Sequence, residues 1–169
     1  GPGVLRDRPV VYVANHISLL DIPALVVGLP PVPRFMMKKE LLKVPLFGPA
    51  ARAAGHIAID RGNRGAAFAA YEVAAEVVRR GRSALVFAEG TRIYEGRLAR
   101  PRQGAARLAL VTGVPIVPVA IYGNRWSESL FKVKALLAVP ADLPDAELQR
   151  GLEALANEMM VDMELGDAV

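Results

Sequence analysis

Short apolar segments alternate along this chain with longer segments whose apolar residues recur every three or four positions. The short segments are rich in β-branched residues and predict β-strands at Pro9–Ala14, Arg34–Lys38, His56–Asp60, Ser83–Ala88, Ile116–Tyr122 and Phe131–Val139. The longer segments predict α-helices over Asp21–Leu29, Gly65–Arg80, Gln103–Thr112 and Pro144–Met163. This alternation predicts an α/β fold, a single layered domain over residues 1–169 whose mixed, mostly parallel sheet is flanked by helices.

Two segments depart from this pattern. Leu41–Ala54 is interrupted by two prolines and a glycine, so we expect no single long helix there. Val114–Ile121 also contains two prolines, which within a strand are typical of a sheet edge or a bulge. This segment has no catalytic side chain, so we expect Ile116, Val117 and Pro118 to form an apolar wall, the alternative being ordinary core.

The composition is apolar and basic. Hydrophobic residues make up 53% of the chain, yet charges interrupt every apolar run before it reaches the roughly 18–20 residues of a spanning helix. The surplus therefore belongs to a core, a lipid groove or a membrane-facing patch. The net charge of +4 favours anionic partners. Because the basic residues are interleaved with aliphatic residues rather than with stacking aromatics, nucleic acid is the weaker choice of partner.

Several classes of chemistry are excluded by what the chain lacks. It has no cysteine and two histidines, so a disulfide, a thiolate nucleophile and a cysteine or multi-histidine metal site are not expected. We expect neither a metal nor a cofactor. The first two residues, Gly1 and Pro2, resemble the remnant of a removed affinity tag, and we expect residues upstream of them in the natural protein.

The first candidate for chemistry is the segment Asn15–Asp21, which follows a predicted strand and begins a predicted helix. Sites in open α/β sheets lie at the carboxyl ends of strands. A turn there can fold the Asp21 carboxylate onto the His16 imidazole, giving a general base and the group that orients it. The alternative is a half-buried histidine beside a helix-capping aspartate. Ser18 is expected to cap the turn, because no Gly-x-Ser-x-Gly nucleophile motif surrounds it.

Two further strand ends carry arginine. Arg61 follows the strand His56–Asp60, and the segment Phe87–Arg92 ends a third strand with Glu89, Gly90, Thr91 and Arg92. Arginine binds phosphate through two parallel hydrogen bonds, and backbone N–H groups at a glycine turn also bind anions. The alternatives are an Arg61–Asp60 surface pair and a tight turn with ordinary charges. A base and two arginines beside apolar strands predict a site for an amphipathic phosphate.

Taken together, these segments resemble the glycerolipid acyltransferase family, that of the 1-acylglycerol-3-phosphate acyltransferases. The family's His-x4-Asp signature matches His16 and Asp21, and its further blocks match Gly55–Arg61, Phe87–Arg92 and Val114–Ile121. Lys38–Gly48 and Gln103–Ala106 also fit. Ala88 stands where the family usually has proline, which removes no chemistry. The helical membrane-embedding segment that many relatives carry before the first strand is not part of this sequence.

The resemblance implies direct transfer of a fatty acyl group from acyl-CoA or acyl carrier protein, as co-substrate, to the hydroxyl of lysophosphatidic acid, which gives phosphatidic acid. His16 would be the base, Asp21 its partner, and the phosphate would be held by Arg61, Glu89, Gly90, Thr91 and Arg92. Glycerol 3-phosphate or another lysolipid is the alternative acceptor. A thioester hydrolase and a non-catalytic lipid-binding module are the alternative functions.

The segment Arg34–Gly48 alternates basic and large apolar residues, a pattern that favours contact with an anionic membrane. We expect a peripheral protein on the cytoplasmic face of the cell membrane. The contacts predicted for this segment are Phe35, Lys38, Lys39, Lys43 and Phe47. The alternative is that its apolar side chains all belong to the core.

Overall fold

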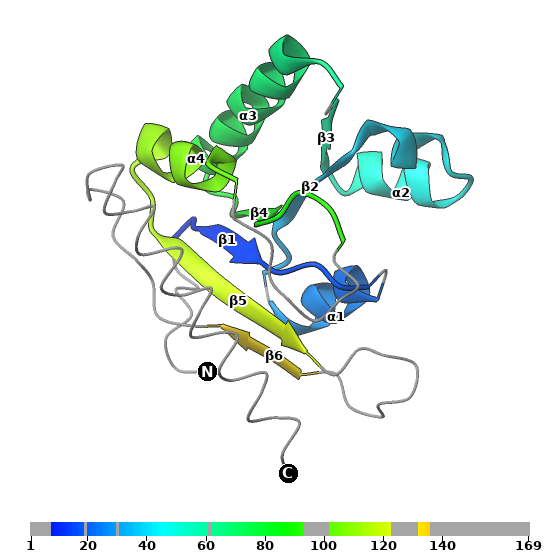
Figure 1. Ribbon diagram of the computed structural model, residues 1–169, viewed down its shortest axis with the longest axis horizontal. Helices are drawn as coiled ribbons and strands as arrows, with labels where there is room; N and C mark the ends of the chain where they lie inside the picture. The colour runs from blue at the N-terminus through cyan, green and yellow to red at the C-terminus, as the bar shows by residue number, and fades with distance from the viewer. Residues whose placement is uncertain are drawn as a thin grey trace.

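The computed structural model describes residues 8–18, 20–29, 31–60, 62–92, 102–122 and 132–135. Within this part, a six-stranded sheet has the order β3-β2-β4-β1-β5-β6 (Figure 1). Its strands are β1 (Val11–Ala14), β2 (Arg34–Lys38), β3 (Ile57–Ile59), β4 (Ala84–Phe87), β5 (Ile116–Tyr122) and β6 (Lys132–Ala135). Neighbouring strands are parallel except β5 and β6, which are antiparallel. The predicted mixed, mostly parallel α/β sheet is confirmed.

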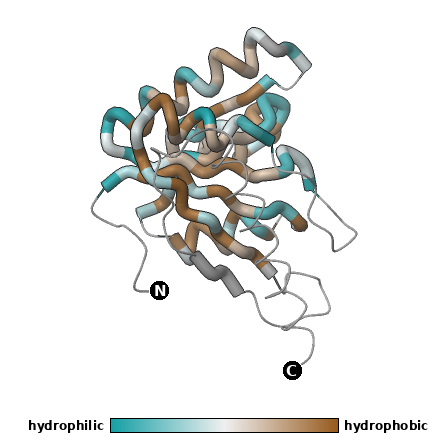
Figure 2. The backbone as a smooth tube through the Cα atoms, turned by 60° about the vertical axis from the view of Figure 1, so that its left-hand side comes forward, coloured by the Kyte–Doolittle hydropathy of each residue, from teal (hydrophilic) through white to brown (hydrophobic). Residues whose placement is uncertain are grey.

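Helices cover both faces of the sheet. They are α1 (Asp21–Gly28) on one face and α3 (Arg64–Arg79) and α4 (Gly104–Thr112) on the other. The 3-10 helix η1 (Lys39–Lys43) and α2 (Phe47–Ala53) lie between β2 and β3 in the chain. Side chains of α3 and α4 form one core with Val11 and Val13 of β1. The other face buries Tyr12 and Ala14 against Leu25 of α1. Hydrophobic segments accordingly concentrate in the central strands (Figure 2). Because successive side chains of a strand point to opposite faces, β1 and β4 must be apolar throughout.

The predicted elements are confirmed within a residue or two where the structure describes them. The interrupted segment Leu41–Ala54 forms the end of η1, a turn and α2. Strand β6 occupies Lys132–Ala135 of the predicted Phe131–Val139. The predicted helix Pro144–Met163 lies outside the described residues.

The expectation of a sheet edge at the two prolines is wrong. Strand β5 lies between β1 and β6. Pro115 precedes the strand, and Pro118 lies opposite Val13 of β1. Among the described residues, the pairing of β5 with β6 starts at Val119, opposite Ala135. An interior strand thus accommodates Pro118, although proline has no N–H to donate to a neighbouring strand.

Candidate active site at the carboxyl edge of the sheet

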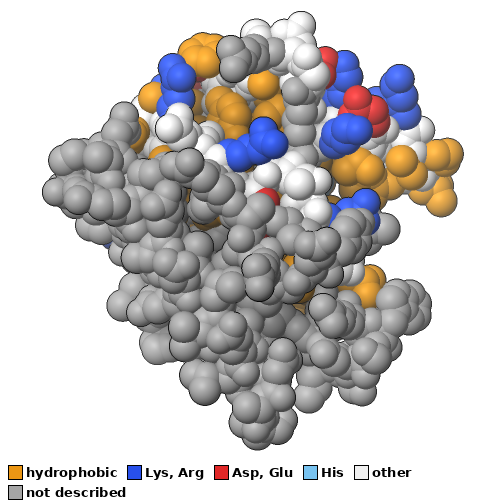
Figure 3. Space-filling view, viewed as in Figure 1, with side chains coloured by type: hydrophobic (Ala, Val, Ile, Leu, Met, Phe, Trp, Pro, Cys, Tyr) orange, Lys and Arg blue, Asp and Glu red, His pale blue; other side chains and the backbone are white. Residues whose placement is uncertain are grey.

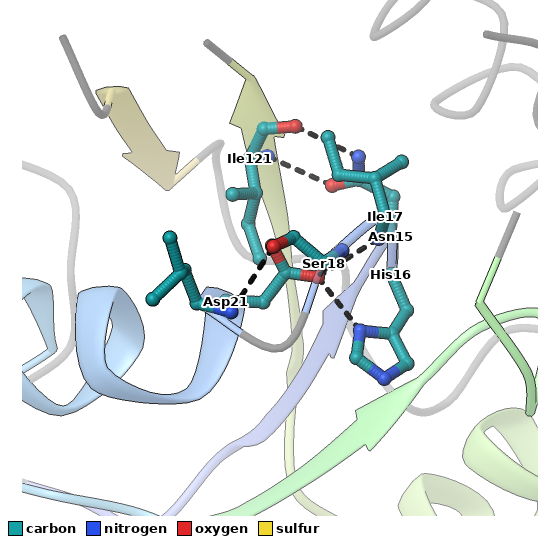
Figure 4. Close-up of polar contacts among 7 residues, drawn as sticks. Asn15, His16, Ile17, Ser18, Asp21 and Ile121 are labelled. Carbon is teal, nitrogen blue, oxygen red and sulfur yellow. Dashed lines mark hydrogen bonds and ion pairs between the residues drawn. The ribbon is translucent and has the colours of Figure 1, made fainter. Parts of the chain in front are cut away.

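A buried asparagine fixes the point where the chain leaves β1. The Asn15 side chain is 1% exposed. Its Nδ2 donates to the carbonyl of Ile121, at 2.8 Å, and its Oδ1 accepts from the N–H of Ile121, at 2.7 Å. The side-chain amide thus continues the β1–β5 ladder by one step while the backbone turns away. The next residue, His16, is therefore held at the edge of the sheet (Figure 4).

Asp21 organises the loop between β1 and α1. Its carboxyl Oδ2 accepts the backbone N–H groups of Ile17 and Ser18, at 2.8 and 2.9 Å, and lies 2.7 Å from Nδ1 of His16. Its side chain is fully buried. Asp21 is the first residue of α1 rather than its N-cap, which is Leu20. The carboxylate therefore folds back over the preceding loop and orients the imidazole, as the dyad hypothesis predicts.

His16 has the geometry of a general base. A carboxylate has no proton to give, so Nδ1 is the ring nitrogen that donates to Asp21, and when the ring is neutral Nε2 carries the lone pair that a base needs. Figure 4 shows this second nitrogen directed away from the carboxylate. The ring stacks on Phe87 of β4, with 4.0 Å between centroids and 17° between planes. The side chain is 15% exposed, so it remains accessible to a substrate.

Ser18 serves the turn, as expected. Its Oγ accepts the N–H of Leu20 at 3.1 Å, and its carbonyl accepts the N–H of Asp21 at 3.5 Å. The N–H groups of Ile17 and Ser18 already donate to Asp21. They are consequently not available to stabilise an oxyanion in this conformation.

A buried carboxyl group lies beneath the turn after β4. Glu89 is 4% exposed, and its Oε2 has no hydrogen-bond partner in the described part of the chain. Burial raises the Glu89 pKa to about 7, nearby Asp21 adds to the rise, and the backbone N–H groups of Glu89 and His16 oppose it. A direct contact between this side chain and a phosphate, as expected from the sequence, is not supported, because the carboxyl faces the interior.

The turn itself is shaped by Gly90 and Arg102. Gly90 has a φ of +70°, a conformation that side-chain-bearing residues rarely adopt. A Cβ there would come within 3.1 Å of Cδ and Nε of Arg102. Arg102 donates from Nε to the carbonyl of Glu89, at 3.1 Å, and from its N–H to the carbonyl of Ala88, at 2.9 Å. Glycine thus permits an arginine to pack across the turn that supports His16.

Comparison with known proteins decides the family. A family model described as Acyltransferase matches residues 2–122. The chain belongs to the acyltransferase family. It is 38% identical over 127 residues to a 1-acyl-sn-glycerol-3-phosphate acyltransferase of Cocos nucifera, covering 73% of this chain and 41% of that protein. With the corresponding protein of Limnanthes douglasii it is 35% identical over 138 residues, covering 79% of this chain and 49% of that protein.

The chain thus spans less than half the length of these two curated relatives. A solved structure shares the fold: the 1-acyl-sn-glycerophosphate (LPA) acyltransferase, PlsC, of Thermotoga maritima matches with a TM-score of 0.80 and 28% identity. The match covers 96% of this chain and 69% of that one. The glycerolipid acyltransferase resemblance seen in the sequence is confirmed.

The remaining predicted phosphate ligands differ in exposure and in whether the structure describes them. Thr91 is exposed and Arg92 half-buried, directly after the turn that carries Glu89. Arg61 lies outside the described residues. Its neighbour Asp60 forms an ion pair with Lys39 and accepts the N–H of Gly62 at 3.0 Å. The side-chain hydrogen bond between Lys39 and Asp60 raises the Lys39 pKa and lowers the Asp60 pKa.

The predicted apolar wall is buried inside the domain. Ile116 packs in the core beneath α3 and α4, and Val117 packs in the opposite core. Pro118 is also buried. An acyl-binding role for Ile116, Val117 and Pro118 stays a prediction.

Among the described residues, no cluster of histidine, cysteine, aspartate and glutamate could hold a metal ion.

The predicted membrane contacts divide by exposure. The predicted membrane contact of Phe35 is wrong, because β2 is an interior strand covered on both faces and Phe35 is 2% exposed in the core. Its ring meets the His56 ring edge-on, with 5.1 Å between centroids. Burial of His56 and the charge of nearby Arg34 lower the His56 pKa. The predicted contacts that are exposed are Lys38, Lys39, Lys43 and Phe47.

Sequence reasoning missed several residues that shape this site. Asn15 fixes the start of the His16 loop, Phe87 stacks on His16, and Arg102 packs against the turn that carries Glu89 and Gly90. The position of Asn15 directly before the histidine was the available signal. Arg102 offered none, because its contact depends on a turn that lies thirteen residues earlier.

Proposed function

We propose that this chain is the catalytic domain of an acyltransferase that converts lysophosphatidic acid to phosphatidic acid in phospholipid biosynthesis. The donor is acyl-CoA or acyl carrier protein. One observation carries the proposal: Nδ1 of His16 is held by the buried Asp21 carboxylate. The curated relatives of this chain are named 1-acyl-sn-glycerol-3-phosphate acyltransferases, which supports this reaction. No cofactor is required by this chemistry.

In the proposed mechanism, Nε2 of His16 accepts the proton of the acceptor hydroxyl as its oxygen attacks the thioester carbonyl. An ester C–O bond forms, the thioester C–S bond breaks, and the leaving thiolate takes this proton from the imidazolium. Asp21 stabilises the imidazolium while the proton resides there. General-base assistance of this kind contributes a rate factor of about 10²–10⁴. The acceptor phosphate is held by Arg92, the turn at Gly90 and Thr91, and Arg61.

The proposal is tested by incubating the purified protein with an acyl-CoA and a panel of acceptors and measuring product mass. Phosphatidic acid formed from lysophosphatidic acid supports it, and His16→Ala is the control that should lower turnover about 10²-fold or more. A product from glycerol 3-phosphate or another lysolipid would change the acceptor. Free fatty acid without acceptor would indicate a hydrolase. Lysolipid binding without turnover would indicate a non-catalytic lipid-binding module.

We further propose that the domain works as a peripheral protein on the cytoplasmic face of the cell membrane. The product is a lipid, so a site beside the bilayer releases it without passage through water. The net charge of +4 favours an anionic surface. No helix in the described part of the chain is long and apolar enough to cross a membrane. Binding to anionic vesicles tests whether the domain docks on a membrane surface, and fractionation of cells tests its location.

A further inference from the structure

Three apolar side chains project from the turn between η1 and α2. Leu46 is 89% exposed, Val44 42% and Phe47 36%; we call these three residues the apolar tip. Figure 3 shows hydrophobic side chains gathered over α2, at the right of the view, with charged side chains beside them. A fully exposed leucine next to an exposed valine and phenylalanine has a cost in water and calls for a covering partner.

The backbone holds Leu46 outward through a strained turn. Leu46 has a φ of 64° and a ψ of −50°. Among the described residues, every other residue with a positive φ is a glycine. The N–H of Phe47 donates to the carbonyl of Pro45 at 2.7 Å, which closes a three-residue γ-turn of the rare, strained kind. Such strain persists where the surroundings enforce it, and it marks functional segments.

Backbone hydrogen bonds and close packing hold the rest of the turn. The N–H of Gly48 donates to the carbonyl of Val44 at 2.8 Å, and the N–H of Val44 donates to the carbonyl of Leu41 at 3.2 Å. A Cβ on Gly48 would collide with the carbonyl oxygen of Leu42. The apolar tip is therefore built into a close-packed structure.

Basic side chains and the active site lie nearby. Lys43 of η1, Arg52 of α2 and Lys38 at the end of β2 are exposed. The exposed acid of η1 is Glu40, whose Oε2 lies 3.9 Å from Nζ of Lys38. Strands β1 and β2 both run parallel to β4, so η1, which follows β2, leaves the same edge of the sheet as the His16 loop. Apolar side chains beside net positive charge are complementary to an anionic bilayer.

We propose that the apolar tip of Val44, Leu46 and Phe47 inserts into an anionic bilayer, with Lys38, Lys43 and Arg52 over the headgroups, and so places the His16 edge at the membrane surface. The proposal rests on the proposed function in that it names the surface from which this site takes its lipid substrate. Compared with the sequence-based set, it replaces Phe35 with Val44 and Leu46, which the structure shows to be exposed. It also replaces Lys39, which is paired with Asp60, with Arg52.

The test is flotation with vesicles of phosphatidylcholine and phosphatidylglycerol that contain no substrate. Leu46→Gly is the decisive variant, because glycine accepts the positive φ without strain while the side chain is lost. It should fold at least as stably as the wild type and bind about ten-fold or more weakly. Val73→Ser, which alters a 54% exposed valine on α3, is the matched control and should bind like the wild type.

Wild-type binding should also fall on vesicles of phosphatidylcholine alone, because the charge contribution is then lost. Equal binding of the wild type and Leu46→Gly, or no wild-type binding to either vesicle, would overturn the proposal. A wild-type dimer that becomes a monomer in Leu46→Gly would also overturn it, by assigning the tip to a second copy. Acyl transfer to a short-chain, water-soluble lysophosphatidic acid is measured separately. It should be equal in both proteins, and its absence in both would reject the proposed function alone.

Discussion

Replacing Asp21 separates two roles that one oxygen atom combines. Oδ2 of Asp21 orients His16 and also accepts the backbone N–H groups of Ile17 and Ser18. Asp21→Asn can keep an oxygen in this position, so both backbone donors remain satisfied, but the negative charge that stabilises the imidazolium is lost. Asp21→Ala removes the acceptor altogether. We expect the first variant to lose activity and the second to lose both activity and stability.

The magnitudes follow from these contacts. A donor left without a partner in a protein interior costs about 1–3 kcal/mol, so two donors cost about 2–6 kcal/mol, and the lower half applies because Ile17 and Ser18 are only partly buried. The free energy of unfolding of Asp21→Asn should lie within about 1 kcal/mol of the wild-type value, since this is the net contribution of a typical hydrogen bond. Its turnover should fall by about 10² or more, within the range of general-base catalysis.

Turnover is measured as release of the coenzyme A thiol with lysophosphatidic acid as acceptor, and stability by urea unfolding followed by circular dichroism. Wild-type turnover in Asp21→Asn would refute the role of the charge in supporting His16. Equal stability of Asp21→Asn and Asp21→Ala would refute the role of the carboxylate in holding the loop.

Three further predictions follow from the site and its supports. Arg92→Ala should raise the acceptor KM about ten- to hundred-fold, with incomplete rescue by lysine; an unchanged KM in steady-state kinetics would remove Arg92 from the phosphate site. Burial raises the Glu89 pKa from 4.5 to about 7, so the folded protein holds this proton more tightly than the unfolded chain does. The contribution of the protonated Glu89 to folding stability is therefore complete below pH 4.5 and is lost as pH rises through 7. Glu89→Gln, which cannot ionise, should gain stability relative to the wild type between pH 5 and pH 8 in urea unfolding, and a parallel pH dependence of the two proteins would contradict this. Gly48→Ala should destabilise the fold by about 1–3 kcal/mol, whereas Gly65→Ala, whose Cβ meets only a 3.4 Å contact, should not; equal urea midpoints would refute the close packing against Leu42.

Local pattern was sufficient to predict the order of the elements and the residues at their ends. An apolar run followed by a polar turn identifies the carboxyl end of a buried strand, and parallel strands share one edge. His16 and Glu89 were therefore expected at the same edge, and the structure places them there, with Phe87 stacked on His16. The i,i+5 spacing of His16 and Asp21 needed only a turn to form the dyad, and that turn is local.

Burial, in contrast, was decided by tertiary structure. Phe35 and Phe47 belong to the same mixed segment, yet one is 2% exposed in an interior strand and the other 36% exposed after a turn. Glu89 looked like one of several charges in a polar turn until the packing around it left its carboxyl inside. The pairing of Asn15 with Ile121 joins residues 106 positions apart. Exposure and long-range pairing depend on which faces neighbouring elements cover, and that is a property of the assembled sheet rather than of any segment of sequence.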